Sequence, residues 1–189
     1  LTSSASIPMI VFSNDITVAG DGIHVFGFTP EQEVGRMMSF AARQGISCQL
    51  AMVPDSGYGR AVAKAFLGRG GQAGSSQNVA TFSSDGSDIA AVVKDLAAEY
   101  GVGGSSGPLG CIFIASGGDQ LRAIATRLPY YDVDMASVQL LGTALWRAGG
   151  IGEEPALRGG WFAAPARGNL AYFNQGYLTA FGAPPPFRA

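Results

Sequence analysis

The sequence contains few of the residue types that carry out covalent or metal chemistry, and they lie far apart. Its single histidine, His24, is in a short extended run, and no Gly-x-Ser-x-Gly nucleophile elbow occurs in the chain. Catalysis by a Ser-His-Asp or Cys-His set would require that histidine. We therefore expect His24 to be a hydrogen-bonded residue of a connecting segment, and we predict that the protein is not an enzyme.

The two cysteines, Cys48 and Cys111, lie in separate apolar runs at residues 46–53 and 109–115. No Cys-x-x-Cys or His-x-x-x-His pair is present, so no metal site is expected. The favoured interpretation is that both cysteines are small buried hydrophobic side chains. A disulfide would require their strands to be neighbours, and bridges across adjacent parallel strands usually have poor geometry.

The glycine-rich and acidic segments have ordinary structural explanations. Residues 68–73 fit the pattern G-x-G-x-x-A, but they follow a predicted helix and precede a predicted strand, the reverse of a dinucleotide fingerprint. No phosphate loop and no cofactor are therefore expected. We interpret Asp85, Asp88 and Asp119 as residues that cap helix N-termini.

The polar residues that could bind a small molecule directly follow predicted strands. In open α/β sheets, ligands bind beyond the carboxyl ends of the strands. Small hydroxyl groups, backbone N–H groups and an aromatic ring at such an edge are suited to a polar small molecule. The alternative is that these are ordinary turn and cap residues. The candidates at this edge are Asp55, Tyr58, Ser116, Gly117, Thr143 and Trp146.

A repeated pattern predicts the elements that position these residues. Apolar, β-branched-rich runs begin at Cys48, Asn78, Cys111 and Val138, about one β-α unit apart. Amphipathic stretches separate them, and we predict helices beginning after Thr29, over 58–67 and 89–100, up to a stop at Pro129, and over 170–181. Continuous apolar strands favour an α/β fold, a Rossmann-like parallel sheet with helices on both faces.

Composition excludes several classes of protein. Of the 189 residues, 47% are hydrophobic, which excludes disorder, and 12 basic residues against 14 acidic ones exclude a nucleic-acid binder driven by charge. No apolar stretch reaches the roughly 20 residues needed to cross a membrane. No signal peptide is visible, and we expect the sequence to be a piece of a longer protein.

Four ordered motifs resemble those of the type I periplasmic binding-protein family. They are IVFSND (10–15), VPDSGYG (53–59), QLLGT (139–143) and GWFAAP (160–165). The chain looks most similar to leucine/isoleucine/valine-binding-protein-like receptors and to the related penicillin-binding-protein activator lipoproteins. Such proteins have two Rossmann-like lobes that hold a ligand in the cleft between them.

The resemblance implies a domain organisation. Residues 1–28 would be a remnant of the first lobe and a crossing segment, residues 29–158 the second α/β lobe, and residues 159–189 the return crossing strand and a helix of the first lobe. The family's sheet order places the first and third strands of the lobe side by side, which makes Cys48 and Cys111 candidate neighbours.

The resemblance also implies a function. It adds Ser13 and Asn14 to the candidate ligand-binding residues, and it places Tyr58 at a position that commonly contacts ligand. Ser116 stands where branched-chain amino-acid binders often have an aromatic residue. The loop 142–145 lacks the acidic residue that these binders use for the ligand's ammonium group, which counts against ordinary amino-acid binding and raises the activator-like alternative.

We therefore expect an extracytoplasmic solute-binding receptor of the ABC-transporter type, with an amino-acid-like small molecule as ligand and a membrane permease as partner. The alternative is an envelope lipoprotein that acts through protein–protein interaction with a cell-wall synthase. Either protein would be periplasmic or otherwise extracytoplasmic. Lipid anchoring through an upstream segment is left open, and no nucleic-acid partner is expected.

Overall fold

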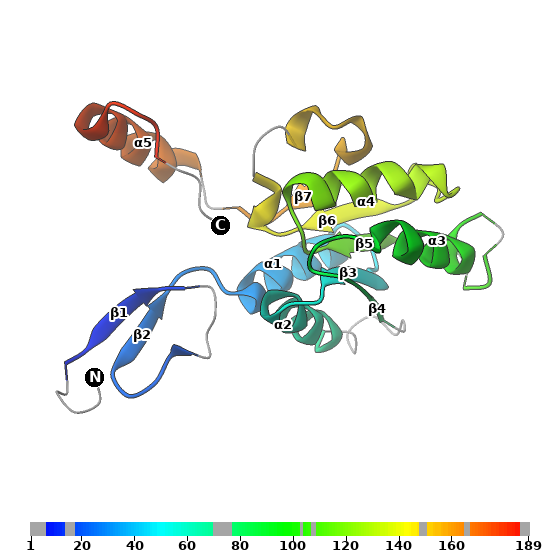
Figure 1. The fold of residues 1–189 in the computed structure, drawn as a ribbon, viewed down its shortest axis with the longest axis horizontal. Helices are drawn as coiled ribbons and strands as arrows, with labels where there is room; N and C mark the ends of the chain where they lie inside the picture. The colour runs from blue at the N-terminus through cyan, green and yellow to red at the C-terminus, as the bar shows by residue number, and fades with distance from the viewer. Residues whose placement is uncertain are drawn as a thin grey trace.

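Five parallel strands form the central sheet of the computed structural model, which describes residues 7–13, 18–69, 77–102, 104–106, 109–147, 151–164 and 167–185. The strand order is β4-β3-β5-β6-β7, and every neighbouring pair is parallel. Figure 1 shows the helices arranged around this sheet. The predicted α/β class is therefore confirmed. The strands are β3 (Leu50–Pro54), β4 (Asn78–Phe82), β5 (Cys111–Ile114), β6 (Gln139–Gly142) and β7 (Trp161–Phe162).

Helices cover both faces of the sheet, as the continuous apolar strands predicted. Successive strand residues point to opposite faces. In β5, Cys111 and Phe113 belong to the core cluster that contains α1 and α2, whereas Ile112 and Ile114 belong to the cluster that contains α3 and α4. The helices are α1 (Pro30–Arg43), α2 (Gly57–Leu67), α3 (Ile89–Tyr100) and α4 (Gly118–Tyr130).

The ends of α1 follow the sequence signals. The backbone N–H of Thr29 donates to Oε1 of Gln32 at 3.2 Å, as expected at a capped N-terminus with proline in the first turn. At the other end Gly45 has φ of +75°, which glycine adopts without a steric penalty.

The helix α4 ends later than predicted. It continues through Pro129 to Tyr130, because the φ of proline is itself helical and proline in the last turn removes only one hydrogen bond. The backbone N–H of Tyr131 then bonds the carbonyl of Arg127 at 3.0 Å.

The predicted capping roles of the aspartates need correction. Asp88 is the N-cap of α3 but makes no cap bond to the helix; its Oδ1 accepts the N–H of Ser83 at 2.7 Å. Asp85 accepts from Ser87 within the same loop. Asp119 lies inside the first turn of α4 and pairs with Arg122 at 3.0 Å. The aspartates that bond in the loop before α3 therefore shape that loop instead of capping its helix.

The sheet has one strand more than the sequence pattern predicted. The two residues of β7 pair with Leu141 and Gly142 of β6, and Ala163 is buried directly after them. Without β7, β6 would be an edge strand with unpaired backbone groups. The sequence analysis expected a return crossing strand in residues 159–189 but did not predict that it pairs with β6, because two residues are too few to show a periodic pattern.

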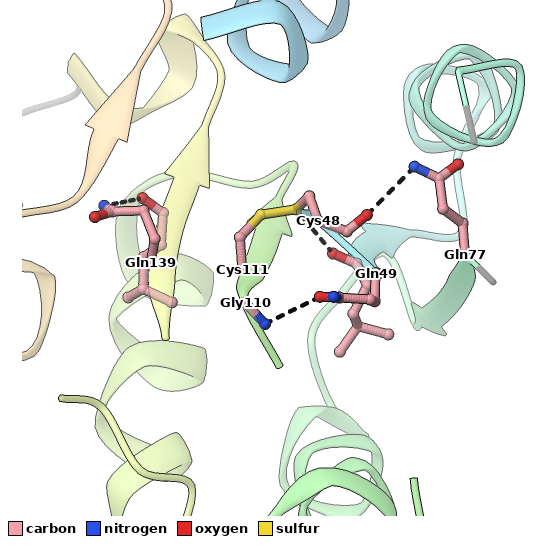
Figure 2. The surroundings of a disulfide bond; sticks show 8 residues. Cys48, Gln49, Gln77, Gly110, Cys111 and Gln139 are labelled. Atoms are coloured by element: carbon pink, nitrogen blue, oxygen red, sulfur yellow. Dashed lines mark hydrogen bonds between the residues drawn. A yellow bond between two sulfur atoms is a disulfide. The ribbon is translucent and has the colours of Figure 1, made fainter. Parts of the chain in front are cut away.

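Cys48 and Cys111 form a disulfide with a Cα–Cα distance of 4.5 Å, so the interpretation as two unbonded side chains is wrong (Figure 2). Two features explain the bond. β3 and β5 are neighbours in space, with β4 on the outer side of β3, and Cys48 precedes the first residue of β3, where the regular ladder has not yet begun.

Glutamine side chains support the same edge of the sheet. Oε1 of Gln49 accepts the N–H of Gly110 at 3.0 Å, and Nε2 of Gln77 donates to the carbonyl of Cys48 at 3.3 Å (Figure 2). The amino ends of the central strands are thus connected by a covalent bond and by side-chain hydrogen bonds.

Two further parts of the chain lie outside this sheet and project from it (Figure 1). β1 (Met9–Phe12) and β2 (Ile23–Phe26) form a separate two-stranded parallel sheet, and α5 (Arg167–Phe181) follows β7. Both carry exposed aromatic side chains, with Phe12 84% and Tyr172 87% accessible to solvent. The predicted assignment of these parts to a first lobe stays a prediction.

Candidate ligand-binding edge of the sheet

The carboxyl ends of β3, β5 and β6 lie side by side, because β5 runs parallel between the other two strands. The loops that follow these strands contain six of the predicted ligand-binding residues: Asp55, Tyr58, Ser116, Gly117, Thr143 and Trp146. Asp55 and Trp146, which are 91 positions apart in the sequence, thereby reach one edge, as the sequence pattern predicted for an open α/β sheet. Their role in ligand binding stays a prediction.

Two predicted residues are placed elsewhere or not at all. Ser13 directly follows β1, in the separate two-stranded sheet, where its backbone packs so closely against Gly27 that a Cβ on that glycine would overlap the carbonyl of Ser13. Asn14 lies outside the described residues.

A hydrogen bond between side chains crosses the edge. The hydroxyl of Tyr58 donates to Oγ1 of Thr143 at 2.9 Å, and Thr143 is fully buried. Tyr58 is positioned by the start of α2, where Oγ of Ser56 accepts the N–H of Gly59 at 3.0 Å. This bond links the loop after β3 with the end of β6, across the end of β5.

Gly59 has a steric role at this helix start. A Cβ at this position would overlap the carbonyl oxygen of Pro54, so the Ser-Gly-Tyr-Gly turn can approach the end of β3 this closely only with glycine there.

Glu33 is a member of the edge that the sequence analysis missed. It lies in the first turn of α1, and its Oε1 accepts the backbone N–H of Ala144 at 3.1 Å. In the sequence it looks like an ordinary acidic residue near a helix N-terminus. Nothing in the local pattern shows that α1 places it against a loop more than 100 residues later.

The electrostatics of this group follow from burial. Burial raises the pKa of the Glu33 carboxyl above its usual value, and the hydrogen bond from Ala144 opposes that rise. Burial also raises the pKa of the Tyr58 hydroxyl; the bond with Thr143 lowers it in part, and the negative charge of Glu33 raises it further. Tyr58 therefore stays a neutral phenol at physiological pH.

Ser116 brings an unsatisfied hydroxyl group to the end of β5. It is 3% exposed, and its Oγ has no hydrogen-bond partner among the described residues. Gly117, the N-cap of α4, packs closely on the backbone of Leu145, where a Cβ would overlap the carbonyl. The space next to the Cα of Gly118 is open.

Trp146 belongs to the packing of the lobe. It lies in the 3-10 helix η3 (Ala144–Arg147), is buried, and its Nε1 donates to the carbonyl of Ile114 at 3.1 Å. Its ring occupies the space that a Cβ on Gly142 would need. Both the ring and the N–H of Trp146 are thus used in internal contacts, and its contact with a ligand stays a prediction.

Asp55 is at the outer rim of the edge. Its carboxylate pairs with Arg60 at 3.0 Å, and both side chains are about 70% exposed. Such an exposed pair contributes little to stability.

A hollow of about 710 Å³ opens at the opposite edge of the sheet, next to the amino ends of β5 and β6. Ser47, Gly110, Gln139 and Arg158 are among the residues that line it. None of the predicted site residues takes part in it, so the hollow and the candidate edge are separate features.

No other chemical centre is visible in the described parts of the chain. They contain no group of three His, Cys, Asp or Glu residues placed to hold a metal ion, and no helix among them is long and apolar enough to span a membrane. His24 is in β2 of the two-stranded sheet, so its predicted extended conformation is confirmed, but it lies in a paired strand and not in a connecting segment.

Comparison of the fold with solved structures gives several matches. A leucine-binding protein, LivK, from Thermotoga maritima superposes with a TM-score of 0.70 at 14% identity, covering 97% of this chain and 53% of the other. An ABC-transporter substrate-binding protein from Desulfitobacterium hafniense gives a TM-score of 0.59 at 21% identity, with 97% and 53% covered. The C-domain of LpoA from Haemophilus influenzae, a regulator of PBP1A, gives 0.50 at 17% identity, with 67% and 36% covered.

These likenesses show the fold. The chain spans about half of the length of the two solute-binding neighbours. No protein-family model matches the sequence, and no curated protein matches it. The expected resemblance in fold to type I periplasmic binding proteins is confirmed, with the five-stranded sheet and its helices corresponding to one lobe.

Proposed function

Because the chain has the fold of one lobe of a type I periplasmic binding protein, we propose that it is part of a non-enzymatic, extracytoplasmic solute-binding receptor of the ABC-transporter type. The observation that carries this proposal is the edge formed by the carboxyl ends of β3, β5 and β6. There the hydroxyls of Tyr58, Ser116 and Thr143 and the carboxylate of Glu33 surround the ends of three adjacent strands. A small polar solute would be held between this edge and the first lobe of the receptor.

The proposed domain division fits this function. In the described parts of the chain, α1 to α4 and the strands β3 to β7 form the sheet and its covering helices, whereas β1, β2 and α5 lie outside the sheet; this supports a division into residues 1–28, 29–158 and 159–189. The exposed aromatic side chains of β1, β2 and α5 support the idea that these parts pack against the first lobe of the receptor.

The disulfide supports an extracytoplasmic compartment. Cys48 and Cys111 are bonded and almost completely buried. Structural disulfides persist in the periplasm and outside the cell and are rare in the cytosol. This supports an extracytoplasmic location, in agreement with the neighbours described as extracellular ligand-binding receptors.

The proposal is tested by titrating a panel of solutes into the full-length protein and measuring heat and thermal shift. The panel contains amino acids, polyamines, neutral sugars and carboxylic acids. We expect at least one class to bind and to raise the melting temperature. Heat and thermal shifts that stay at the level of buffer controls for every class would contradict the proposal.

The alternative function is regulation of a cell-wall synthase by an activator-like envelope lipoprotein. The fold similarity to the LpoA C-domain favours it, as does the bond between Tyr58 and Thr143, which connects two loops across the edge where a ligand would enter. Affinity capture with purified cell-wall synthases tests this alternative. If it is correct, a synthase is retained and no solute of the panel binds.

A further inference from the structure

Glu33 is a half-buried carboxylate in the first turn of α1, and no cation is found bonded to it in the parts of the chain that the structure describes. Neither the ion pair Arg60–Asp55 nor the ion pair Arg122–Asp119 includes it. Its only bonded partner in the described part of the chain is the neutral N–H of Ala144. Partial burial of a carboxylate costs free energy, as the raised pKa of Glu33 indicates, and a nearby cation would offset this cost.

The groups next to Glu33 are also suited to a cation. One carboxylate oxygen, Oε1, is bonded to Ala144, while Oε2 makes no hydrogen bond in the described structure. The hydroxyl of Tyr58 donates its hydrogen bond to Oγ1 of Thr143, so the lone pairs of the Tyr58 oxygen remain available as acceptors. Since Ala144 follows Thr143 in the chain, these acceptors converge on one short loop.

A positively charged solute would satisfy all of these groups at once. An ammonium group has three donors and no acceptor, which matches two or three converging oxygens. Its charge would compensate the burial of Glu33, whereas an anionic group would be repelled by it. Because burial raises the pKa of Tyr58, its hydroxyl stays neutral and keeps the proton that it donates to Thr143.

On the basis of the proposed function, we propose that Glu33, a residue of α1, determines solute specificity by accepting a protonated amine of the ligand beside Tyr58. The solute class is therefore amines, such as amino acids or polyamines, and neither neutral sugars nor carboxylic acids without an amino group. The carboxylate comes from the helix that covers the sheet and not from the loop after β6, which contains no acidic residue between Gly142 and Arg147.

The test compares matched solutes on the full-length protein by titration calorimetry. Each amino acid or polyamine is measured beside its N-acetyl counterpart, in which the acetylated nitrogen carries no charge. Because the acetyl group also adds bulk, the Glu33→Gln variant below separates the effect of charge from that of size. We expect the amines to bind and the acetylated forms to bind at least about tenfold more weakly, since hydrogen bonds to charged groups contribute strongly to binding.

Glu33→Gln provides the second arm. Glutamine keeps an oxygen acceptor for the Ala144 N–H, so the loop retains its support, and circular dichroism checks that the fold is unchanged. We expect amine binding to weaken about tenfold to hundredfold. Glu31→Gln, an exposed position two residues earlier in the same helix, is the matched control and should bind as the wild type does.

The outcomes separate this inference from the proposed function. Equal binding of amines and acetylated forms, unchanged binding by Glu33→Gln, or binding confined to sugars or carboxylic acids would overturn the role of Glu33 while solute binding stands. The absence of binding by every solute would overturn both.

Discussion

Single side chains connect the candidate edge more directly than the sequence indicates. The sequence pattern places Tyr58 and Thr143 at the same edge of the sheet, but it does not show that their hydroxyl groups meet at 2.9 Å. Glu33 reaches Ala144 from a helix that precedes the whole sheet. The chemistry of the edge therefore depends on contacts between residues that are distant in the sequence.

We expect Tyr58→Phe to destabilise the lobe by about 1–3 kcal/mol, because it leaves the hydroxyl of the fully buried Thr143 without its donor. Urea denaturation of the variant and the wild type measures the difference. Tyr130→Phe is the control, since Tyr130 is 76% exposed. Equal stabilities of the two variants would show that the Tyr58–Thr143 bond contributes nothing.

The stability difference between Glu33→Gln and the wild type should depend on pH. In the unfolded chain Glu33 titrates near its ordinary value of 4.5, and in the folded protein burial raises its pKa. The folded state therefore holds the proton more tightly, and the cost of the buried charge appears as pH rises through this range. Below the unfolded pKa, Glu33 is neutral in both states and the cost is absent.

Denaturation at several values from about pH 4 to about pH 7 measures this dependence. We expect the wild type to lose stability relative to Glu33→Gln as pH rises. A trend in the opposite direction would mean that the folded protein stabilises the charge of Glu33.

At the scale of elements, the order of the strands explains both the disulfide and the candidate edge. β3 and β5 are separated in the chain by a complete β-α unit but are neighbours in the sheet. This crossover brings Cys48 next to Cys111 at the amino edge, and at the carboxyl edge it places the loop after β5 between those after β3 and β6. One topological feature thus organises the two opposite edges.

Removing the disulfide with Cys48→Ala and Cys111→Ala should destabilise the protein by about 4 kcal/mol. The bond closes a loop with a sequence separation of 63 residues, and the chain-entropy relation gives a cost of that size for an unfolded chain without it. Urea denaturation of the double variant measures the loss. Wild-type protein denatured in the presence of a reductant should lose the same free energy of unfolding as the double variant. A double variant as stable as the oxidised wild type would contradict the prediction.

At the scale of the whole molecule, the structure divides into a well-packed sheet with four covering helices and two parts outside it. Both faces of the sheet have their own buried core clusters. In contrast, β1, β2 and α5 expose large apolar side chains, among them Ile10, Phe12, Phe26, Tyr172 and Phe181. Exposed apolar surface of this kind marks an interface, in agreement with the proposed contact with a first lobe.

Hydrogen exchange should reveal this division. In the 189-residue chain we expect backbone amides of β3, β5 and β6 to be the most protected, and those of β1, β2 and α5 to exchange much faster, because few buried contacts hold these parts. Mass spectrometry of exchanged peptides measures the pattern. In the full-length protein the same segments should become protected, and equal protection of all segments in the 189-residue chain would contradict the proposed division.

Sequence reasoning predicted the fold class because its signals are local. The apolar runs at β3, β4, β5 and β6 and the helix start after Thr29 depend only on neighbouring residues. The predictions were wrong or incomplete where contacts with distant parts of the chain decide the local structure. The helix α4 continues through Pro129 to Tyr130, and the two residues of β7 pair with the edge of β6.

The sequence by itself determined that strands and helices alternate and that polar loops follow the strands, because hydrophobic periodicity and turn residues act within a few positions. Only the tertiary structure decided that Cys48 meets Cys111, that Tyr58 bonds Thr143, and that Glu33 belongs to the edge. Each of these pairings depends on the order of strands in the sheet and on the packing of α1 against it, and neither is encoded within a local segment.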